Sequence, residues 1–476
     1  MHSGSYLPGG LLTAGPALRS LSNLRDASAV ADLFLGVFRR DLQAFYPQTQ
    51  VQPERDDGPT ADLAGGPNFR LERAEDDALT VDLFGIRYRL RPREGLRFTD
   101  QDERMVEAVG AVLGLRYLHL FQITHSSRLE LYRGGSEDHY IAAFVEPSAY
   151  HPSAVRPSRI AATIHTLRTT ALSTYENRRV STGVLLLGPG GDPSRPTPPD
   201  ALPYGVELTS LKSVHRLCDG KRTLFQVDSF GRLSHVIDVR ARALEIAAGD
   251  GVQTPCARDY TSHARVTATG GHVCLVLSPN QEIKLFADGS QAFAFSHGRW
   301  RILDPASKFR VWSEAISDAR LARVLFQTAL DLAECRQGGL FVVVEDPAKV
   351  AGRLVAPHDL LSFDSPDGPP DDLNTGDPLA KRALHYLARG RQVTDLEPPI
   401  LEALAAIDGA LVIDQKGQLH AFGAILRQDA SAASGPVAEG ARTTAAIIAS
   451  RFGAVLKVSE DGIVSCFLDG VRVWDL

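Results

Sequence analysis

The segment from Leu340 to Val344 constrains the fold of this 476-residue chain more than any other. All of its residues are apolar (LFVVV), so a strand formed here has no polar face. Such strands occur in the centre of sheets that helices cover on both sides. The preceding segment, from Ser317 to Gly339, has apolar residues at helical spacing, with Asp318 in its first turn and Gly338 at its end. These patterns predict an α/β domain with a central mixed sheet flanked by helices.

The rest of the C-terminal third continues this alternation. We expect helices at 377–390 and 398–406, strands at 410–414 and 419–426, a helix that starts at Gly440, and a strand that ends at Ser459. Residues 313–476 would then form one domain of about 160 residues, a common domain size.

Two further domains are expected before it, because a chain of this length exceeds one ordinary core. Residues 1–200 have the pattern of a mixed α/β domain, a candidate sensor, in which we expect strands at Tyr117–Thr124 and Leu129–Arg133. Residues 201–312 contain short apolar runs between Gly, Asp and Asn turns, which predicts a β-rich module. No internal repeat at a fixed period is apparent in the sequence.

Composition narrows the range of functions. The net charge of −6 gives no general reason to bind nucleic acid or an anionic membrane. The five cysteines lie far apart, which disfavours a zinc site or disulfide framework, and Cys274 and Cys466 fall in apolar runs typical of buried residues. The N-terminus is a poor signal peptide, and no apolar run approaches the length of a membrane span. We therefore expect a soluble cytoplasmic protein.

Three turns in the C-terminal third carry residues that suit a nucleotide. The first is Asp408-Gly409-Ala410, where a carboxylate precedes two small residues that would let a ribose approach the backbone. An Asp-Gly pair is also a common plain turn before a strand.

The second turn is the helix start Gly440-Ala441-Arg442-Thr443-Thr444. Its unpaired backbone N–H groups, one arginine and two hydroxyls could hold phosphate oxygens, although an ordinary helix with a threonine cap has the same sequence features. The third is Ser459-Glu460, at the end of a strand, which could bind a phosphate and a metal ion or form a simple hairpin turn.

Taken together and in this order, the three turns resemble the diadenylate cyclase domain family, which joins two ATP molecules into cyclic di-AMP. The resemblance covers about a third of the chain. It implies that Asp408 is the catalytic residue beside the 3′-hydroxyl, and that Asp408 and Glu460 bind Mg²⁺ or Mn²⁺.

The resemblance also implies that the nucleotide is held by Gly409, Ala410, Gly440, Arg442, Thr443, Thr444 and Ser459. Active sites in that family form when two domains meet face to face, so a homodimer or larger homo-oligomer is implied. The earlier domains would bind an unknown small-molecule or protein effector that regulates the cyclase.

The sequence departs from the family where phosphate is bound. The usual G-T-R-H-R is here Gly440-Ala441-Arg442-Thr443-Thr444, which keeps one arginine and loses a histidine and a second basic residue. A clamp with fewer cations should hold a triphosphate less tightly. Two alternatives therefore stand beside the cyclase hypothesis, a catalytically inactive nucleotide-binding sensor and a cyclase that makes a different cyclic nucleotide.

Overall fold

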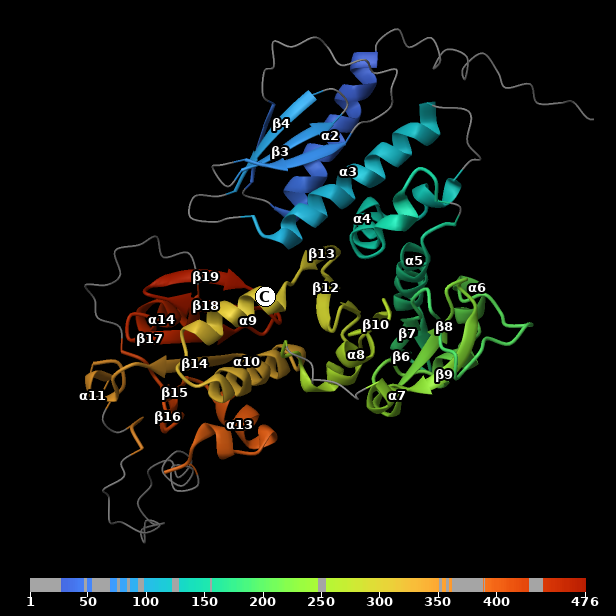
Figure 1. Cartoon of the computed structure of the whole chain (residues 1–476). Helices are drawn as coiled ribbons and strands as arrows, with labels where there is room; N and C mark the ends of the chain where they lie inside the picture. Colours follow the sequence, from blue (N-terminus) through green and yellow to red (C-terminus); the bar gives the residue numbers. More distant parts are fainter. Residues whose placement is uncertain are drawn as a thin grey trace, which may run out of the picture. The chain divides into compact units, whose positions relative to one another are not determined.

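The fold is described from a computed structural model of the chain (Figure 1). It describes residues 27–46, 49–53, 69–74, 78–83, 86–92, 98–121, 128–154, 156–246, 254–350, 353–356, 359–361, 388, 390–427 and 440–476. The chain separates into two compact units, Met1–Thr169 and Thr170–Leu476. The predicted helix at 377–390 lies almost entirely outside the described residues.

The first unit is built on a four-stranded antiparallel sheet in the order β1-β4-β3-β2. Its strands are β1 (Gln50–Pro53), β2 (Arg70–Arg73), β3 (Leu79–Leu83) and β4 (Ile86–Arg91). Along β3 every second side chain is buried, as expected of a strand with one face on a core. The helices are α2 (Ala27–Phe45), α3 (Asp100–Phe121), α4 (Ser136–Val145) and α5 (Arg159–Ala171), the last of which crosses the boundary between the units.

Two of the strand predictions in this unit are wrong. The described part of Tyr117–Thr124 is the last turn of α3, whose earlier residues Val109, Val112 and Leu113 are buried. The segment Leu129–Tyr132 forms the 3₁₀ helix η2, in which Leu131 alone is buried. Short apolar runs do not distinguish a strand from a buried helix, and burial against neighbouring elements decided both cases.

The second unit contains a seven-stranded sheet in the order β13-β12-β11-β10-β7-β8-β9. Its strands are β7 (Thr182–Leu186), β8 (Thr223–Val227), β9 (Leu233–Asp238), β10 (Val273–Leu277), β11 (Ile283–Ala287), β12 (Ser290–Ser296) and β13 (Arg299–Ile302). Strands β7 and β8 are parallel and all other neighbours are antiparallel. The sheet thus contains most of the strands expected in 201–312 and also β7, which precedes residue 200. The three-domain division stays a prediction.

Helices accompany this sheet: α6 (Val206–Thr209), η4 (Lys212–Arg216), α7 (Val239–Ile246), η5 (Arg258–Tyr260), α8 (Thr261–Val266) and α9 (Pro305–Glu314). Residues of α7 and α8 pack on Leu185, Cys274 and Phe286 of the sheet. A small separate hairpin joins β5 (Thr174–Tyr175) to β6 (Arg178–Arg179).

The same unit contains a six-stranded mixed sheet in the order β16-β15-β14-β17-β18-β19. Its strands are β14 (Gly339–Val344), β15 (Ala410–Asp414), β16 (Leu419–Ala424), β17 (Gly453–Val458), β18 (Val464–Leu468) and β19 (Val471–Asp475). The helices are α10 (Ala319–Glu334), α11 (Pro347–Val350), α13 (Pro398–Ala405) and α14 (Ala441–Ala449), and η7 (Val393–Asp395) precedes α13.

Alternate residues of β14 enter two different cores. Phe341 and Val343 join a cluster with residues of α10 and α13, whereas Leu340, Val342 and Val344 join a cluster with Ala446 and Ala449 of α14. The sheet is therefore covered by helices on both faces, as in Figure 1, which explains why β14 has no polar side. This arrangement confirms the predicted α/β fold with a central mixed sheet flanked by helices.

The two sheets of the second unit repeat one topology, which sequence analysis missed. In each, a central pair of parallel strands (β7 and β8, β14 and β15) is extended by one hairpin strand on one side and by antiparallel strands on the other, four in the first sheet and three in the second. Even a register shift recurs, immediately before Phe286 in β11 and Phe467 in β18. We call residues 182–296 the first repeat, and residues 319–475, which include the preceding helix α10, the second repeat.

The turns of the two repeats also match in hydrogen bonding. After β8, Asp228 Oδ1 accepts from the backbone N–H groups two and four residues later, at 2.8 and 2.9 Å. Asp414, the last residue of β15, does the same, at 2.9 Å for both bonds. After β10 and β17, the N–H of Ser278 donates to the carbonyl four residues on at 2.8 Å, and that of Ser459 does so at 2.9 Å. The match in both topology and turn geometry defines an internal structural duplication.

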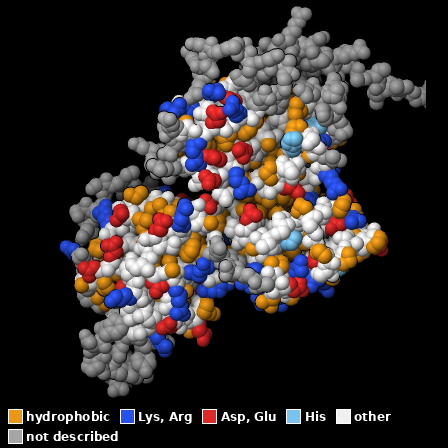
Figure 2. Space-filling model, in the orientation of Figure 1, with side chains coloured by type: hydrophobic (Ala, Val, Ile, Leu, Met, Phe, Trp, Pro, Cys, Tyr) orange, Lys and Arg blue, Asp and Glu red, His pale blue; other side chains and the backbone are white. Residues whose placement is uncertain are grey.

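No helix among the described residues combines the length and apolar character needed to cross a membrane. On the face drawn in Figure 2, Lys and Arg side chains are interspersed with Asp and Glu over the described surface. Cys274 and Cys466 are fully buried, as expected.

Candidate functional site

The three predicted turns of the second repeat lie at one end of its six-stranded sheet. Strand β14 begins at Gly339, which pairs with Val458 at the end of β17, immediately before Ser459. Strand β15 runs parallel to β14 and begins just after Asp408 and Gly409. The sheet therefore brings the first and third turns to the same end of the sheet, where these strands begin or finish, although about fifty residues separate the two turns in the sequence.

The second turn joins them through Arg442. Its guanidinium Nη2 lies 3.4 Å from Oδ1 of Asp408, whose carboxylate is fully exposed to solvent. The same guanidinium lies against Gly338 at the entry to β14, where an added Cβ would come within 2.0 Å of Nη1. Glycine at 338 is therefore required for Arg442 to reach this position beside Asp408.

Gly409 has a structural reason to be glycine. Its φ is +115°, a conformation that other residues rarely adopt, and an added Cβ would lie 2.4 Å from the carbonyl carbon of Gly423 on β16. Ala410 is buried and pairs with Ala424 across the β15–β16 ladder. The roles of Gly409 and Ala410 toward a ribose stay predictions.

The helix start combines exposed and buried groups. Gly440 is the exposed N-cap of α14, and its carbonyl accepts from the N–H of Thr443 at 2.9 Å and of Thr444 at 3.3 Å. Thr443 itself is buried, and its hydroxyl accepts a 2.8 Å hydrogen bond from Nζ of Lys457 on β17. Thr444 is half-buried.

Lys457 is a residue that sequence analysis did not identify. It is the one charged residue within strand β17, and it is half-buried on the face that α14 covers. A second cation therefore lies next to the helix start, where the sequence motif has only one. A lysine within an otherwise apolar strand was the signal that could have drawn attention to it.

The third turn is held by its own side chains. Ser459 Oγ hydrogen-bonds to the carboxylate of Asp461. Burial acts to raise the pKa of Asp461, but hydrogen bonds from Ser459 and the Ile463 backbone outweigh it, so the pKa lies below its usual value. Glu460 is exposed, and no group of three or more potential metal ligands occurs in the part of the chain that the structure describes.

The first repeat has its own versions of these turns. Asp219 and Gly220 precede β8, Arg258 begins the helical segment before β10, and Ser278 follows β10. They occur in the same order as Asp408, Arg442 and Ser459, and this order of short motifs could have revealed the duplication from the sequence. In the first repeat, however, Arg258 is occupied by carboxylates of the second repeat. Its Nη1 lies 2.6 Å from Oδ2 of Asp331 on α10 and also pairs with Glu402 on α13.

Comparisons with known proteins leave the family open. No protein family and no curated protein matches the chain. One matching solved structure, titled as a hypothetical membrane spanning protein from Bacillus cereus, has 18% sequence identity and a TM-score of 0.24 over 35% of this chain and 68% of that one. A double cysteine mutant of DacA from Staphylococcus aureus has 18% identity and a TM-score of 0.21 over 33% of this chain and 87% of that one. At these TM-scores, neither likeness identifies the function of the chain.

Proposed function

We propose that the second repeat binds ATP and, with a second copy of the chain, condenses two ATP molecules into cyclic di-AMP with release of two pyrophosphates. The main support for the proposal is the ion pair between Arg442 and the exposed Asp408, at the end of the sheet where all three turns lie. A nucleotide needs cations for its phosphates and a carboxylate near its ribose, and this edge offers both.

Each side chain has a definite role in this proposal. Arg442, Lys457 and the N–H groups at the start of α14 bind phosphate oxygens. The Asp408 carboxylate accepts a hydrogen bond from the ribose 3′-hydroxyl, whose oxygen then attacks the α-phosphorus of the other nucleotide.

The donor groups at this edge fit a divalent cation. Mg²⁺ usually takes one or two carboxylates, with substrate phosphates and water completing its octahedral shell. Asp408 and Glu460 are both exposed and would be those carboxylates. A bound Mg²⁺ or Mn²⁺ would neutralise charge on the phosphates.

The chemistry requires a second nucleotide opposite the first. The first repeat is unsuited to supply it, because Arg258 already holds Asp331 and Glu402 of the second repeat. In the second repeat, by contrast, the carboxylate that precedes β15, Asp408, is open to solvent. The partner site therefore comes from another chain, and the active species is a homodimer or a larger assembly.

A second candidate function is nucleotide binding without turnover. The hydroxyl of Thr443 is engaged by Lys457, and that of Ser459 by Asp461, so neither is free for a phosphate in the geometry observed. A domain that kept Arg442 but lost these donors would bind ATP as a sensor.

Incubation of the full-length protein with ATP and Mg²⁺ or Mn²⁺, with GTP in parallel, tests the proposal when products are identified by mass spectrometry. We expect cyclic di-AMP from ATP and none from the Asp408→Asn variant, which should still bind ATP within about twofold of the wild type because Arg442 and Lys457, the proposed phosphate-binding side chains, are unchanged. The exposed Asp200→Asn substitution, far from the site in sequence, serves as the control.

The two candidate functions predict different results. If the wild type and Asp408→Asn bind ATP with equal affinity and the ATP is recovered unchanged, the result would support the sensor instead of the cyclase. Production of cyclic di-AMP by Asp408→Asn at the wild-type rate would exclude the catalytic role of Asp408.

A further inference from the structure

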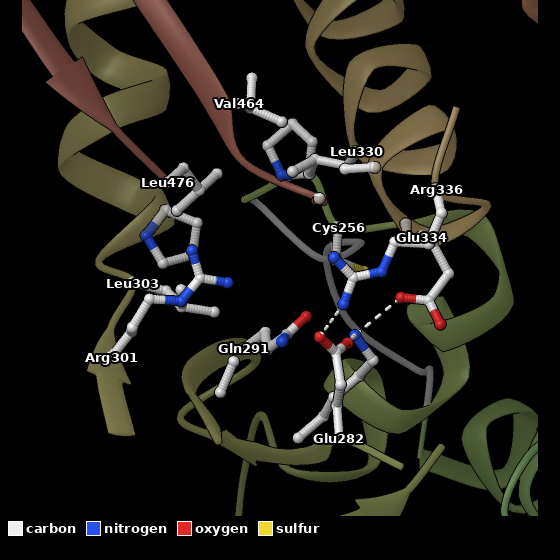
Figure 3. Close-up of a pocket in the computed structure, with 17 residues that line it drawn as sticks. Cys256, Glu282, Gln291, Arg301, Leu303, Leu330, Glu334, Arg336, Val464 and Leu476 are labelled. Carbon is white, nitrogen blue, oxygen red and sulfur yellow. Dashed lines mark hydrogen bonds and ion pairs between the residues drawn. The ribbon is translucent and has the colours of Figure 1, made fainter. Parts of the chain in front are cut away.

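A pocket lies where the first repeat meets α10 and the end of the second repeat (Figure 3). Its walls include Pro255, Cys256 and Ala257, which immediately precede η5, just as Gly440 precedes α14 in the second repeat. The empty volume is about 640 Å³, which includes space open to solvent.

Four charged side chains in the pocket neutralise one another. Nζ of Lys284 lies 2.7 Å from Glu334 and 3.3 Å from Glu282, and Arg336 pairs with Glu282. The side chains of Lys284, Glu282 and Glu334 are each at most 11% exposed. Buried charges of this kind are stable when paired, so these four groups form a closed network.

Arg301 is the remaining cation in the wall. It extends from β13 beside Leu303 and Leu476 (Figure 3), and its Nε is buried without a hydrogen-bond partner. Its side chain forms no ion pair with the residues that the structure describes, and burial lowers its pKa without neutralising a guanidinium. Arg301 is half-buried and its guanidinium has no ion-pair partner among the described residues, which makes this end of the pocket suited to an anion.

Apart from Gln291, the wall near Arg301 has several apolar side chains. Leu303, Leu330, Val464 and Leu476 contribute side chains to it. We propose that this pocket binds a small organic monoanion, a carboxylate with a short apolar body, whose carboxylate pairs with Arg301 while its body contacts these residues. One unpaired cation matches one negative charge, which disfavours inorganic phosphate and nucleotides.

The pocket is connected to the proposed nucleotide site through the end of α10. Arg336 has a left-handed backbone, with φ of +55°, and Gln337 N–H donates to Leu332 at 2.9 Å, so the turn that follows the helix is fixed. Two residues beyond Arg336, Gly338 lies against the guanidinium of Arg442.

A second link runs to the third turn. Arg336 donates a hydrogen bond to the carbonyl of Asp461, whose carboxylate accepts from Ser459. A ligand that moves Arg336 therefore acts on both Arg442 and Ser459. This regulatory part of the inference rests on the proposed function, whereas ligand binding does not.

Binding is tested on the full-length protein by isothermal titration calorimetry with sodium hexanoate as the probe, and with acetate and inorganic phosphate for comparison. We expect hexanoate to bind once per chain, and acetate and phosphate to bind at least tenfold more weakly. Arg301→Met should weaken hexanoate binding at least tenfold, whereas Arg299→Met, an exposed arginine on the same strand, should not change it. Equal binding by wild type and Arg301→Met, or no binding of hexanoate, would overturn the site.

Thermal unfolding without the probe provides an independent readout. Removal of an unpaired, half-buried cation should leave the melting temperature of Arg301→Met at or above that of the wild type. A lower melting temperature of Arg301→Met together with no hexanoate binding to the wild type would mean that a group of the protein itself pairs with Arg301, and the proposal would be wrong.

The regulatory part has its own test. Saturating hexanoate should change ATP affinity at least twofold in the wild type and Arg299→Met, but not in Arg301→Met. If hexanoate binds but the ATP affinity does not change, the proposed coupling between the two sites would be wrong, whereas the hexanoate site itself would stand. A shift in ATP affinity in a protein that makes no cyclic dinucleotide would support the effector site and contradict the proposed cyclase.

Discussion

Two cations approach the start of α14 from different elements. Arg442 belongs to the helix and reaches Asp408, whereas Lys457 comes from β17 and reaches Thr443. The triphosphate of a nucleotide carries several negative charges, and a single arginine at the surface contributes little against solvent screening. Lys457 is half-buried, which makes its charge more effective.

Lys457→Met is therefore predicted to weaken ATP binding about tenfold, because it removes one charge-assisted contact and keeps the apolar stem. The measurement is calorimetric titration with ATP in the presence of Mg²⁺. Lys416→Met, in the exposed hairpin turn between β15 and β16, is the matched control and should bind like the wild type. Unchanged affinity in Lys457→Met would show that the phosphates lie elsewhere.

Gly409 allows a prediction about stability at a single residue. Gly409→Ala forces a Cβ into the backbone of Gly423 at a φ of +115°, which should cost about 2 kcal/mol or more. We expect the melting transition in scanning calorimetry to fall by about 5 °C or more. Gly440→Ala meets nothing within 4 Å and should cost less than about 1 kcal/mol. Similar melting temperatures for both variants would contradict the close packing of β15 against β16.

At the scale of elements, α10 has two functions in the second unit. One face packs on the six-stranded sheet, and Asp331 and Glu334 contact the first repeat. Oδ1 of Asp331 accepts a hydrogen bond from the backbone N–H of Arg258 at 2.6 Å, and Oδ2 forms an ion pair with the Arg258 guanidinium. Burial raises the pKa of Asp331 to about 7, more than Arg258 lowers it, and Glu402 and Asp259 add to the increase.

This raised pKa predicts how stability changes with pH. Between the usual aspartate pKa of 3.8 and about 7, the folded protein binds a proton at Asp331 that the unfolded chain does not. The stabilising contribution of this group is therefore present at low pH and is lost as the pH rises through that window. Asp331→Asn should remove this dependence.

Urea unfolding of the wild type and Asp331→Asn at pH 5 and pH 8 measures the effect. The advantage of the wild type over the variant should be larger at pH 5 than at pH 8. Asp395→Asn, an exposed change in η7, should show no such difference. A wild-type advantage that grows toward pH 8 would mean that the ion pair with Arg258 outweighs burial.

At the scale of the whole molecule, the two repeats have become unequal. The arginine of the first repeat is covered by α10 and α13, whereas the corresponding edge of the second repeat is exposed. The proposed reaction needs two bound ATP molecules, and one chain offers one exposed nucleotide site. The reaction therefore depends on association between chains.

Specific activity for cyclic dinucleotide formation should therefore rise with protein concentration until the dimer saturates. Sedimentation at each concentration, run beside the activity assay, measures the fraction of dimer. The rate per chain should follow this fraction. A constant rate per chain from a species that sedimentation shows to be a monomer would rule out a site shared between chains.

The sequence determined the elements whose signals are local. The apolar run that forms β14, the helical period of α10 and the Asp-Gly turn before β15 each depend on residues a few positions apart, so periodicity and turn chemistry predict them. The order of the three turns also followed from the sequence, because strand and helix boundaries carry recognisable residues.

Tertiary structure decided what depends on contacts between distant segments. The end of α3 is helical and not a strand because it continues a helix whose earlier residues, Val109, Val112 and Leu113, are buried. Lys457 and Thr443 meet only when β17 packs beneath α14, and Arg258 meets Asp331 only when the repeats pack together. The duplication itself was hidden because strand order and register are fixed by backbone hydrogen bonds, which many different apolar side chains permit.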